Sequence, residues 1–148
     1  MELRTLTVVR HTAQFEAMCR FYGELLGMST VETWDRPDGR GAVYAPGGDV
    51  RGAHVEVLDM PGRSTTGAPP ADLVLSLFVT DVHDALVQAG AAVVRGLEET
   101  PWGHRSFGLD DPDGLRIWLV QDLRARGRGA GGRRRRPRSA ARPFPSLS

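Results

Sequence analysis

Residues 54–59 read HVEVLD and residues 116–121 read RIWLVQ, and both segments alternate apolar side chains with other types. A period of two is typical of a β-strand with one buried face. The apolar positions, V-x-V in one segment and I-x-L in the other, suit packing beneath a helix. On the opposite faces Glu56 corresponds to Trp118. The two segments therefore predict the last strand of each half of an internal repeat.

The sequence before each of these strands follows one order, which predicts two β-α-β-β-β modules. The predicted elements are a strand at 3–9, a helix at 13–26 and extended segments at 28–34, 41–45 and 52–58, then a strand at 73–79, a helix at 82–89 and segments at 91–95, 104–109 and 115–120. Amphipathic spacing supports the first helix, and a glycine follows each helix. We expect an α+β fold in which the modules form a curved mixed sheet around a shared cavity. The predicted organisation is a first module at 1–59, a linker at 60–71, a second module at 72–122 and a disordered arginine-rich tail at 123–148.

Charge is divided unevenly along the chain, although the formal net charge is only +1. Residues 1–122 hold 10 Arg and 18 acidic residues, a net −8, whereas residues 123–148 hold 9 Arg and no acid, a net +9. Such a tail either binds nucleic acid through phosphate contacts or is a solvated extension. We favour the solvated extension, because no aromatic residue is interleaved with the arginines. Nucleic acid is thus the less favoured partner, supported by the tail alone.

The composition, with 41% hydrophobic and 25% charged residues, is ordinary for a globular protein. No apolar run approaches the ~20 residues of a membrane span, and the N-terminus has no apolar signal region. Cys19 is the single cysteine, so an internal disulfide framework and a Cys-rich zinc site are excluded. We therefore expect a cytoplasmic protein that has no membrane partner.

Three passages give the sequence a resemblance to a known family. They are FYGELLGM at 21–28, VTDVHDAL at 79–86 followed by AGA at 89–91, and GHR at 103–105 leading into DDPDGLRI at 110–117. In this order and spacing they resemble the vicinal oxygen chelate superfamily, which includes glyoxalase I, extradiol dioxygenases, fosfomycin-resistance enzymes and bleomycin-binding proteins. The resemblance covers roughly residues 3–121. It implies the paired-module fold that the repeat predicts.

The resemblance also implies where a metal would be held. The metal enzymes of the superfamily use side chains from the first and last strand of each half, and these positions fall near Arg4, at Glu56, near Val74 and at Trp118. Only Glu56 among them can bind a metal, because guanidinium, isopropyl and indole groups offer no ligand. We therefore expect no metal and no other cofactor, which places the sequence in the metal-free branch.

Trp118 in a ligand position suggests that the cavity stacks a planar molecule instead. Trp34, Trp102 and Phe78 could join it. The resemblance is then to the drug-sequestering, bleomycin-binding branch, whose members are usually homodimers with ligand grooves between protomers. The predicted function is metal-independent binding of an aromatic or hydrophobic metabolite or antibiotic.

Glu56 is the candidate catalytic residue if the protein is instead a lyase, isomerase or dioxygenase-like enzyme of the superfamily. A desolvated carboxylate beside Trp118 would suit a general base, a metal ligand or a counter-charge for a cationic ligand. Alternatively, it pairs with Arg116 or Arg4 across the cavity. Arg116 is itself a candidate ligand contact. His54 shares the strand face of Glu56, and His104 lies at a predicted rim, so both are candidate ligand contacts. The identity of the ligand, and whether modules pair within one chain or across a dimer, stay open.

Overall fold

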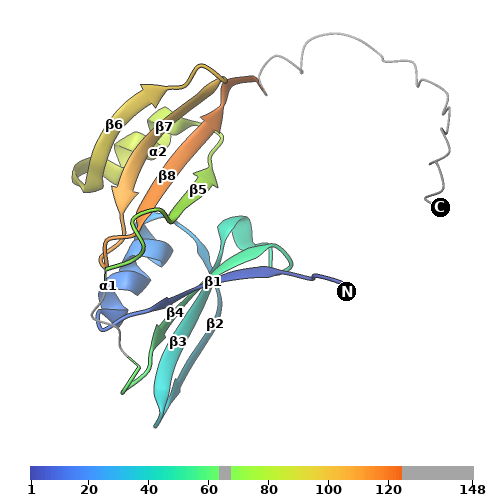
Figure 1. Cartoon of the computed structure of the whole chain (residues 1–148), viewed down its shortest axis with the longest axis vertical. Coiled ribbons are helices and arrows are strands. Elements are labelled where there is room, and N and C mark those ends of the chain that lie inside the picture. The colour runs from blue at the N-terminus through green and yellow to red at the C-terminus, as the bar shows by residue number, and fades with distance from the viewer. Residues whose placement is uncertain (64–67, 125–148) are drawn as a thin grey trace, which may run out of the picture.

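The computed structural model describes residues 1–63 and 68–124 of the 148-residue chain. Most of the predicted tail, from residue 125, and residues 64–67 of the predicted linker lie outside the described residues. The elements, in chain order (Figure 1), are β1 (Leu6–His11), α1 (Phe15–Cys19), the π-helical segment η1 (Arg20–Leu25), β2 (Ser29–Arg36), β3 (Gly39–Ala45), the short turn η2 (Pro46–Gly48), β4 (Ala53–Asp59), β5 (Val74–Phe78), α2 (Val82–Ala89), the turn η3 (Gly90–Ala92), β6 (Val93–Glu99), β7 (His104–Asp110) and β8 (Arg116–Asp122).

The strands form two four-stranded sheets with the same internal order. The first sheet has the order β1-β4-β3-β2 and the second sheet has the order β5-β8-β7-β6. In both, the first and last strands of the module pair in parallel and the other neighbours pair antiparallel. The predicted repeat and the α+β class are confirmed. The described strands do not close into one barrel, so each sheet keeps its own open face.

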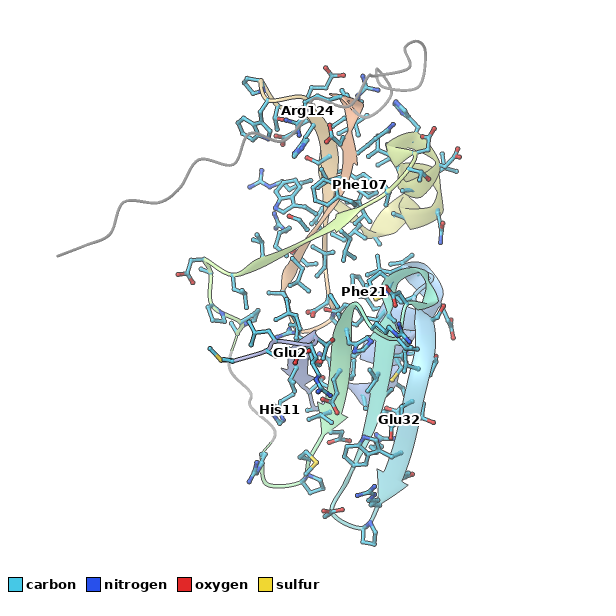
Figure 2. All side chains as sticks on the ribbon, turned by 90° about the vertical axis from the view of Figure 1, so that its right-hand side faces the viewer. Glu2, His11, Phe21, Glu32, Phe107 and Arg124 are labelled. Atoms are coloured by element: carbon cyan, nitrogen blue, oxygen red, sulfur yellow. The ribbon has the colours of Figure 1, made fainter. Side chains whose placement is uncertain are left out.

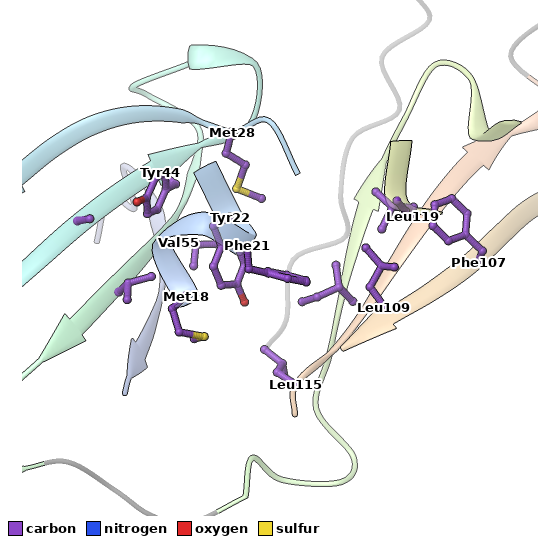
Figure 3. Close-up of a cluster of buried hydrophobic side chains, with 14 of the residues drawn as sticks. Met18, Phe21, Tyr22, Met28, Tyr44, Val55, Phe107, Leu109, Leu115 and Leu119 are labelled. Atoms are coloured by element: carbon purple, nitrogen blue, oxygen red, sulfur yellow. The ribbon is translucent and has the colours of Figure 1, made fainter. Parts of the chain in front are cut away.

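One hydrophobic core joins the two modules. Figure 3 shows Phe21 and Tyr22 of the first module pointing toward Leu109 and Leu115 of the second. Figure 2 places Phe21 at the junction of the modules. Both helical segments therefore lie on the buried sides of the sheets, as the apolar positions of the two quoted strands predict.

The first helix differs from the single α-helix predicted over 13–26. The chain forms α1 and then widens into π-helical turns, in which the Leu26 amide donates to the carbonyl of Phe21 at 3.0 Å. The wider turn brings two successive aromatic side chains, Phe21 and Tyr22, into the core. Gly27, with φ of 64°, ends the segment as predicted.

Asp81 caps α2 by accepting hydrogen bonds from the amides of His83 and Asp84 at 2.9 and 3.3 Å. None of the helices in the described residues is long and apolar enough to cross a membrane.

A buried carboxylate, Asp111, ties the modules together. It accepts from the guanidinium of Arg10 at 3.0 and 3.2 Å and from the hydroxyl of Tyr22 at 2.9 Å. It also accepts from the amides of Asp113 and Leu115, which shapes the turn before β8 as the Asp-Pro-Asp-Gly sequence predicts. Burial and the neighbouring carboxylate raise the pKa of Tyr22, so its hydroxyl keeps its proton and remains a donor. This network fixes the placement of one module against the other.

Candidate functional site

The first sheet turns one face toward its helix and leaves the other open. Val55 and Val57 of β4 are buried on the helix side. His54, Glu56 and Leu58 alternate with them and are half-buried on the open face. Backbone register places Thr7, Val9 and His11 of β1 beside these three residues in turn. The carboxylate of Glu56 has no hydrogen-bond or ion-pair partner among the described residues.

Trp34 lies on this same open face. Register pairs Trp34 with Gly41 and Gly41 with Leu58. The indole rests on the glycine, where a Cβ would stand 2.5 Å from a ring carbon. The guanidinium of Arg36 lies 5.5 Å from the centre of the indole. Trp34 is therefore part of the face that carries Glu56, but two strands away from it.

The open face of the second sheet has Trp118 near its centre. Its neighbours in the register are Ser76 on β5 and Gly108 on β7. Ser76 is small, whereas the space above Gly108 is occupied by the side chains of Arg95 and Arg116, which a Cβ there would meet at 3.0 and 3.3 Å. Arg116 lies 5.8 Å from the centre of the indole and pairs with Asp110, which raises the pKa of the guanidinium.

A hollow of about 340 Å³ opens on one side of Trp118. Strands β5 to β8 supply its floor, and the turn at 100–103 supplies a wall that includes the largely exposed indole of Trp102. Its lining residues are Ser76, Glu98, Thr100, Trp102, His104, Ser106, Trp118 and Val120. A second hollow, of about 290 Å³, lies beyond Trp118 against Pro69 and Pro70. Trp118 thus separates two spaces, one of them with aromatic and polar walls.

His104 is held at the rim of the larger hollow. Its ring meets Phe78 edge to face at 5.6 Å. Its Nε2 lies 3.4 Å from Nη2 of Arg124, and since arginine can only donate, Nε2 acts as the acceptor. Arg124 also binds Asp122 at 3.0 Å, which lowers the pKa of Asp122 to about 2. Figure 2 places Arg124 at the end of the second module remote from the first.

The structure brings together some of the predicted site residues and separates others. Trp102, His104 and Trp118 line one hollow, with Phe78 and Arg116 beside it. His54, Glu56 and Trp34 share the open face of the first sheet instead. Glu56 lines neither of the two hollows beside Trp118.

Two imidazole nitrogens on the first open face are buried without a partner. Nδ1 of His11 and Nε2 of His54 make no hydrogen bond among the described residues. An unsatisfied buried polar atom costs free energy, so native proteins seldom leave one without a partner.

The register also refines the four positions inferred from metal enzymes. Thr7 pairs with His54, which stands two residues before Glu56. In the same way, Val74 pairs with Arg116, which stands two residues before Trp118. Thr7, rather than Arg4, is thus the counterpart of Val74. Arg4 precedes β1, which begins at Leu6.

The corrected donor set does not fit a divalent ion. It offers one carboxylate and one hydroxyl, since valine and indole cannot ligate. Within residues 1–63 and 68–124, no three His, Cys, Asp or Glu side chains gather closely enough to hold a metal.

The sequence profile of the Glyoxalase/Bleomycin resistance protein/Dioxygenase superfamily matches residues 6–119. The chain belongs to this superfamily. A search of curated proteins finds no match. The family match covers both modules of the fold described above.

Solved structures of the superfamily agree with the fold. A glyoxalase I mutant from Zea mays has a TM-score of 0.68 at 19% identity, over 81% of this chain and 47% of that one. This chain thus spans about half the length of the maize protein. Glyoxalase I from Leishmania major has a TM-score of 0.65 at 20% identity, over 85% and 91% of the two chains. The antibiotic-binding protein TnmS3 from Streptomyces sp. CB03234 has a TM-score of 0.62 at 27% identity, over 82% and 97%.

Sequence reasoning did not name five residues of the larger hollow as site residues: Ser76, Glu98, Thr100, Ser106 and Val120. The two serines lie on strands whose alternation could have placed them on the open face. Glu98 falls beyond the strand predicted at 91–95, whereas β6 continues to Glu99. Irregular pairing on both sides of Arg95 breaks the period of two there, so no local pattern indicates which way Glu98 points.

Proposed function

We propose that this protein is a cytoplasmic small-molecule-binding protein that holds an aromatic or hydrophobic metabolite or antibiotic without a metal. The observation that carries the proposal is the hollow of about 340 Å³ with Trp102 and Trp118 in its lining. Its volume lies within the range of small-molecule sites, which are mostly apolar with a few polar groups. Indoles offer flat surfaces that stack planar molecules at low entropic cost. Antibiotic binding by the similar TnmS3 supports the same class of ligand.

We further propose that the working form is a homodimer. In one chain the two open faces stay apart, and both carry exposed apolar residues: Val9 is 43% exposed, Val74 46% and Phe78 64%. A second copy that lays its first sheet over the second sheet would cover these residues. It would also bring Glu56 opposite Trp118 and offer partners to the imidazoles of His11 and His54.

Tryptophan fluorescence tests the binding proposal, with acridine as a neutral planar probe in mildly alkaline buffer. We expect acridine to quench the fluorescence saturably and Trp118→Ala to weaken its binding by up to about tenfold, the value of one aromatic stacking contact. Trp118→Phe keeps an aromatic plane and should retain most of the affinity. Circular dichroism of both variants verifies folding. Absence of saturable quenching by acridine in the folded wild type would contradict the proposal.

A metal-dependent enzyme of the superfamily is the competing function, with Glu56 as general base or ligand. Glu56 supports it because its carboxylate is unpaired on a strand face. Metal analysis of protein purified without chelators separates the two functions. One divalent ion bound per chain, and lost in Glu56→Gln, would favour the enzyme over the binding protein.

A further inference from the structure

Glu98 presents an unpaired carboxylate to the larger hollow. Register sets Glu98 beside Ser106, on the face that carries Trp118, and both residues line the hollow. The carboxylate has no ion pair or hydrogen bond within the part of the chain that the structure describes. Three nearby arginines are engaged by other acids, in the pairs Arg105–Glu99, Arg116–Asp110 and Arg124–Asp122.

The other lining groups do not neutralise this charge. Glu98 and His104 are the titratable residues of the lining. Nε2 of His104 lies 3.4 Å from Nη2 of Arg124, at the rim of the hollow. The remaining lining residues are hydroxyl, indole and aliphatic groups. The lining therefore contains one carboxylate, that of Glu98, and no arginine.

The indoles, like the carboxylate, favour a ligand with a positive charge. The face of an indole attracts cations through its quadrupole. Arg116 already approaches the ring of Trp118 at 5.8 Å, whereas Trp102 is 62% exposed and no cation lies over it among the described residues. A flat ligand between these walls would gain from stacking, and a positive charge on it would gain from both Trp102 and Glu98.

We propose that the hollow selects a planar ring system that carries a positive charge, with Glu98 as the counter-charge that sets this specificity. This rests on the proposed function, because it assumes that a planar molecule occupies the hollow. It adds a ligand class, the aromatic organic cation, and a specificity-determining residue.

Arg95 is the opposing charge to consider. It pairs with Gly108 in the register, on the same open face as Trp118, and it has no ion-pair partner among the described residues. It does not line the hollow. We therefore expect Arg95→Gln to strengthen the binding of a cation modestly, in the direction opposite to Glu98→Gln.

Two probes of matched shape test the proposal: N-methylacridinium, a permanent cation, and neutral acridine. Dissociation constants come from tryptophan quenching of the full chain at low ionic strength. We expect N-methylacridinium to bind about five- to tenfold more tightly than acridine, as a cation–π contact with a partly exposed counter-charge gives. The preference should shrink as sodium chloride is added.

Glu98→Gln should reduce the preference to the part that the indoles supply and leave the affinity for acridine unchanged. Glu99→Gln is the matched control, because it removes the neighbouring carboxylate, which is bound to Arg105, and should keep the preference. Equal binding of both probes to the wild type, or a preference that Glu98→Gln leaves undiminished, overturns the role of Glu98 as the counter-charge and leaves the binding function standing. Failure of both probes to bind overturns the binding function and the specificity with it.

Discussion

At the scale of single residues, Asp111 makes the largest contribution that one side chain can be assigned. Its side chain is fully buried and that of Arg10 is 12% exposed. We expect Asp111→Asn to lower the free energy of unfolding by roughly 3–5 kcal/mol, because it leaves the guanidinium of Arg10 buried without its counter-charge. Urea unfolding followed by circular dichroism measures the change.

The adjacent acid provides the control for this prediction. Asp110 pairs with Arg116, but both side chains are about one-third exposed, so Asp110→Asn should cost no more than about 1 kcal/mol. Similar losses in the two variants would mean that the network around Asp111 does not hold the modules together.

At the scale of elements, the π-helical segment depends on a close approach to β3. A Cβ at Gly23 would stand 3.0 Å from the ring of Tyr44, which is itself buried. Replacing glycine by alanine inside a helix ordinarily stabilises it by up to about 1 kcal/mol. We expect the opposite sign for Gly23→Ala, a loss of roughly 1–3 kcal/mol from overpacking, measured by thermal and urea unfolding.

Gly96 offers a matched comparison for this substitution. It lies in β6 with no atom within 4 Å of the position of a Cβ, so Gly96→Ala should be neutral or slightly stabilising. A stabilised Gly23→Ala variant would show that Tyr44 moves aside freely.

At the scale of the whole molecule, the proposed dimer depends on the open face of the first sheet. Val9 lies beside Glu56 in the register, so Val9→Glu would place two carboxylates next to each other where the second copy is to dock. We expect sedimentation velocity to show a dimer for the wild type and a monomer for this variant, with unchanged circular dichroism.

Val87→Glu serves as the control, since Val87 is 82% exposed on α2, away from both open faces. It should stay dimeric. A monomeric wild type at micromolar concentration would contradict the dimer and leave the hollow of the second sheet as the site of a single chain.

The predicted and observed folds agree where the signal is local. Alternation at 54–59 and 116–121 predicts strands with one buried face, and Gly27 acts as the predicted helix end. The two folds differ where contacts between the modules change the backbone, because no local sequence pattern contains those contacts. The widened turns at Arg20–Leu25 arise because Phe21 and Tyr22 both find room between the modules.

The candidate site likewise contains one residue that a local pattern predicts and another that it does not. Strand parity alone predicts that Trp118 leaves the core, and the structure places it beside a hollow. Parity could not predict that Glu98 lines this hollow, because the irregular pairing of β6 resets the alternation.

The sequence by itself determined the two modules, the order of their elements along the chain and the outward side of Glu56 and Trp118. It could do so because hydrophobic periodicity, helix caps and turns act over a few residues. Only the tertiary structure decided that these two side chains stand on separate open faces. The cause is long-range: the buried network of Arg10, Tyr22 and Asp111 joins residues up to 101 positions apart, and it holds the modules helix side to helix side with both sheets open.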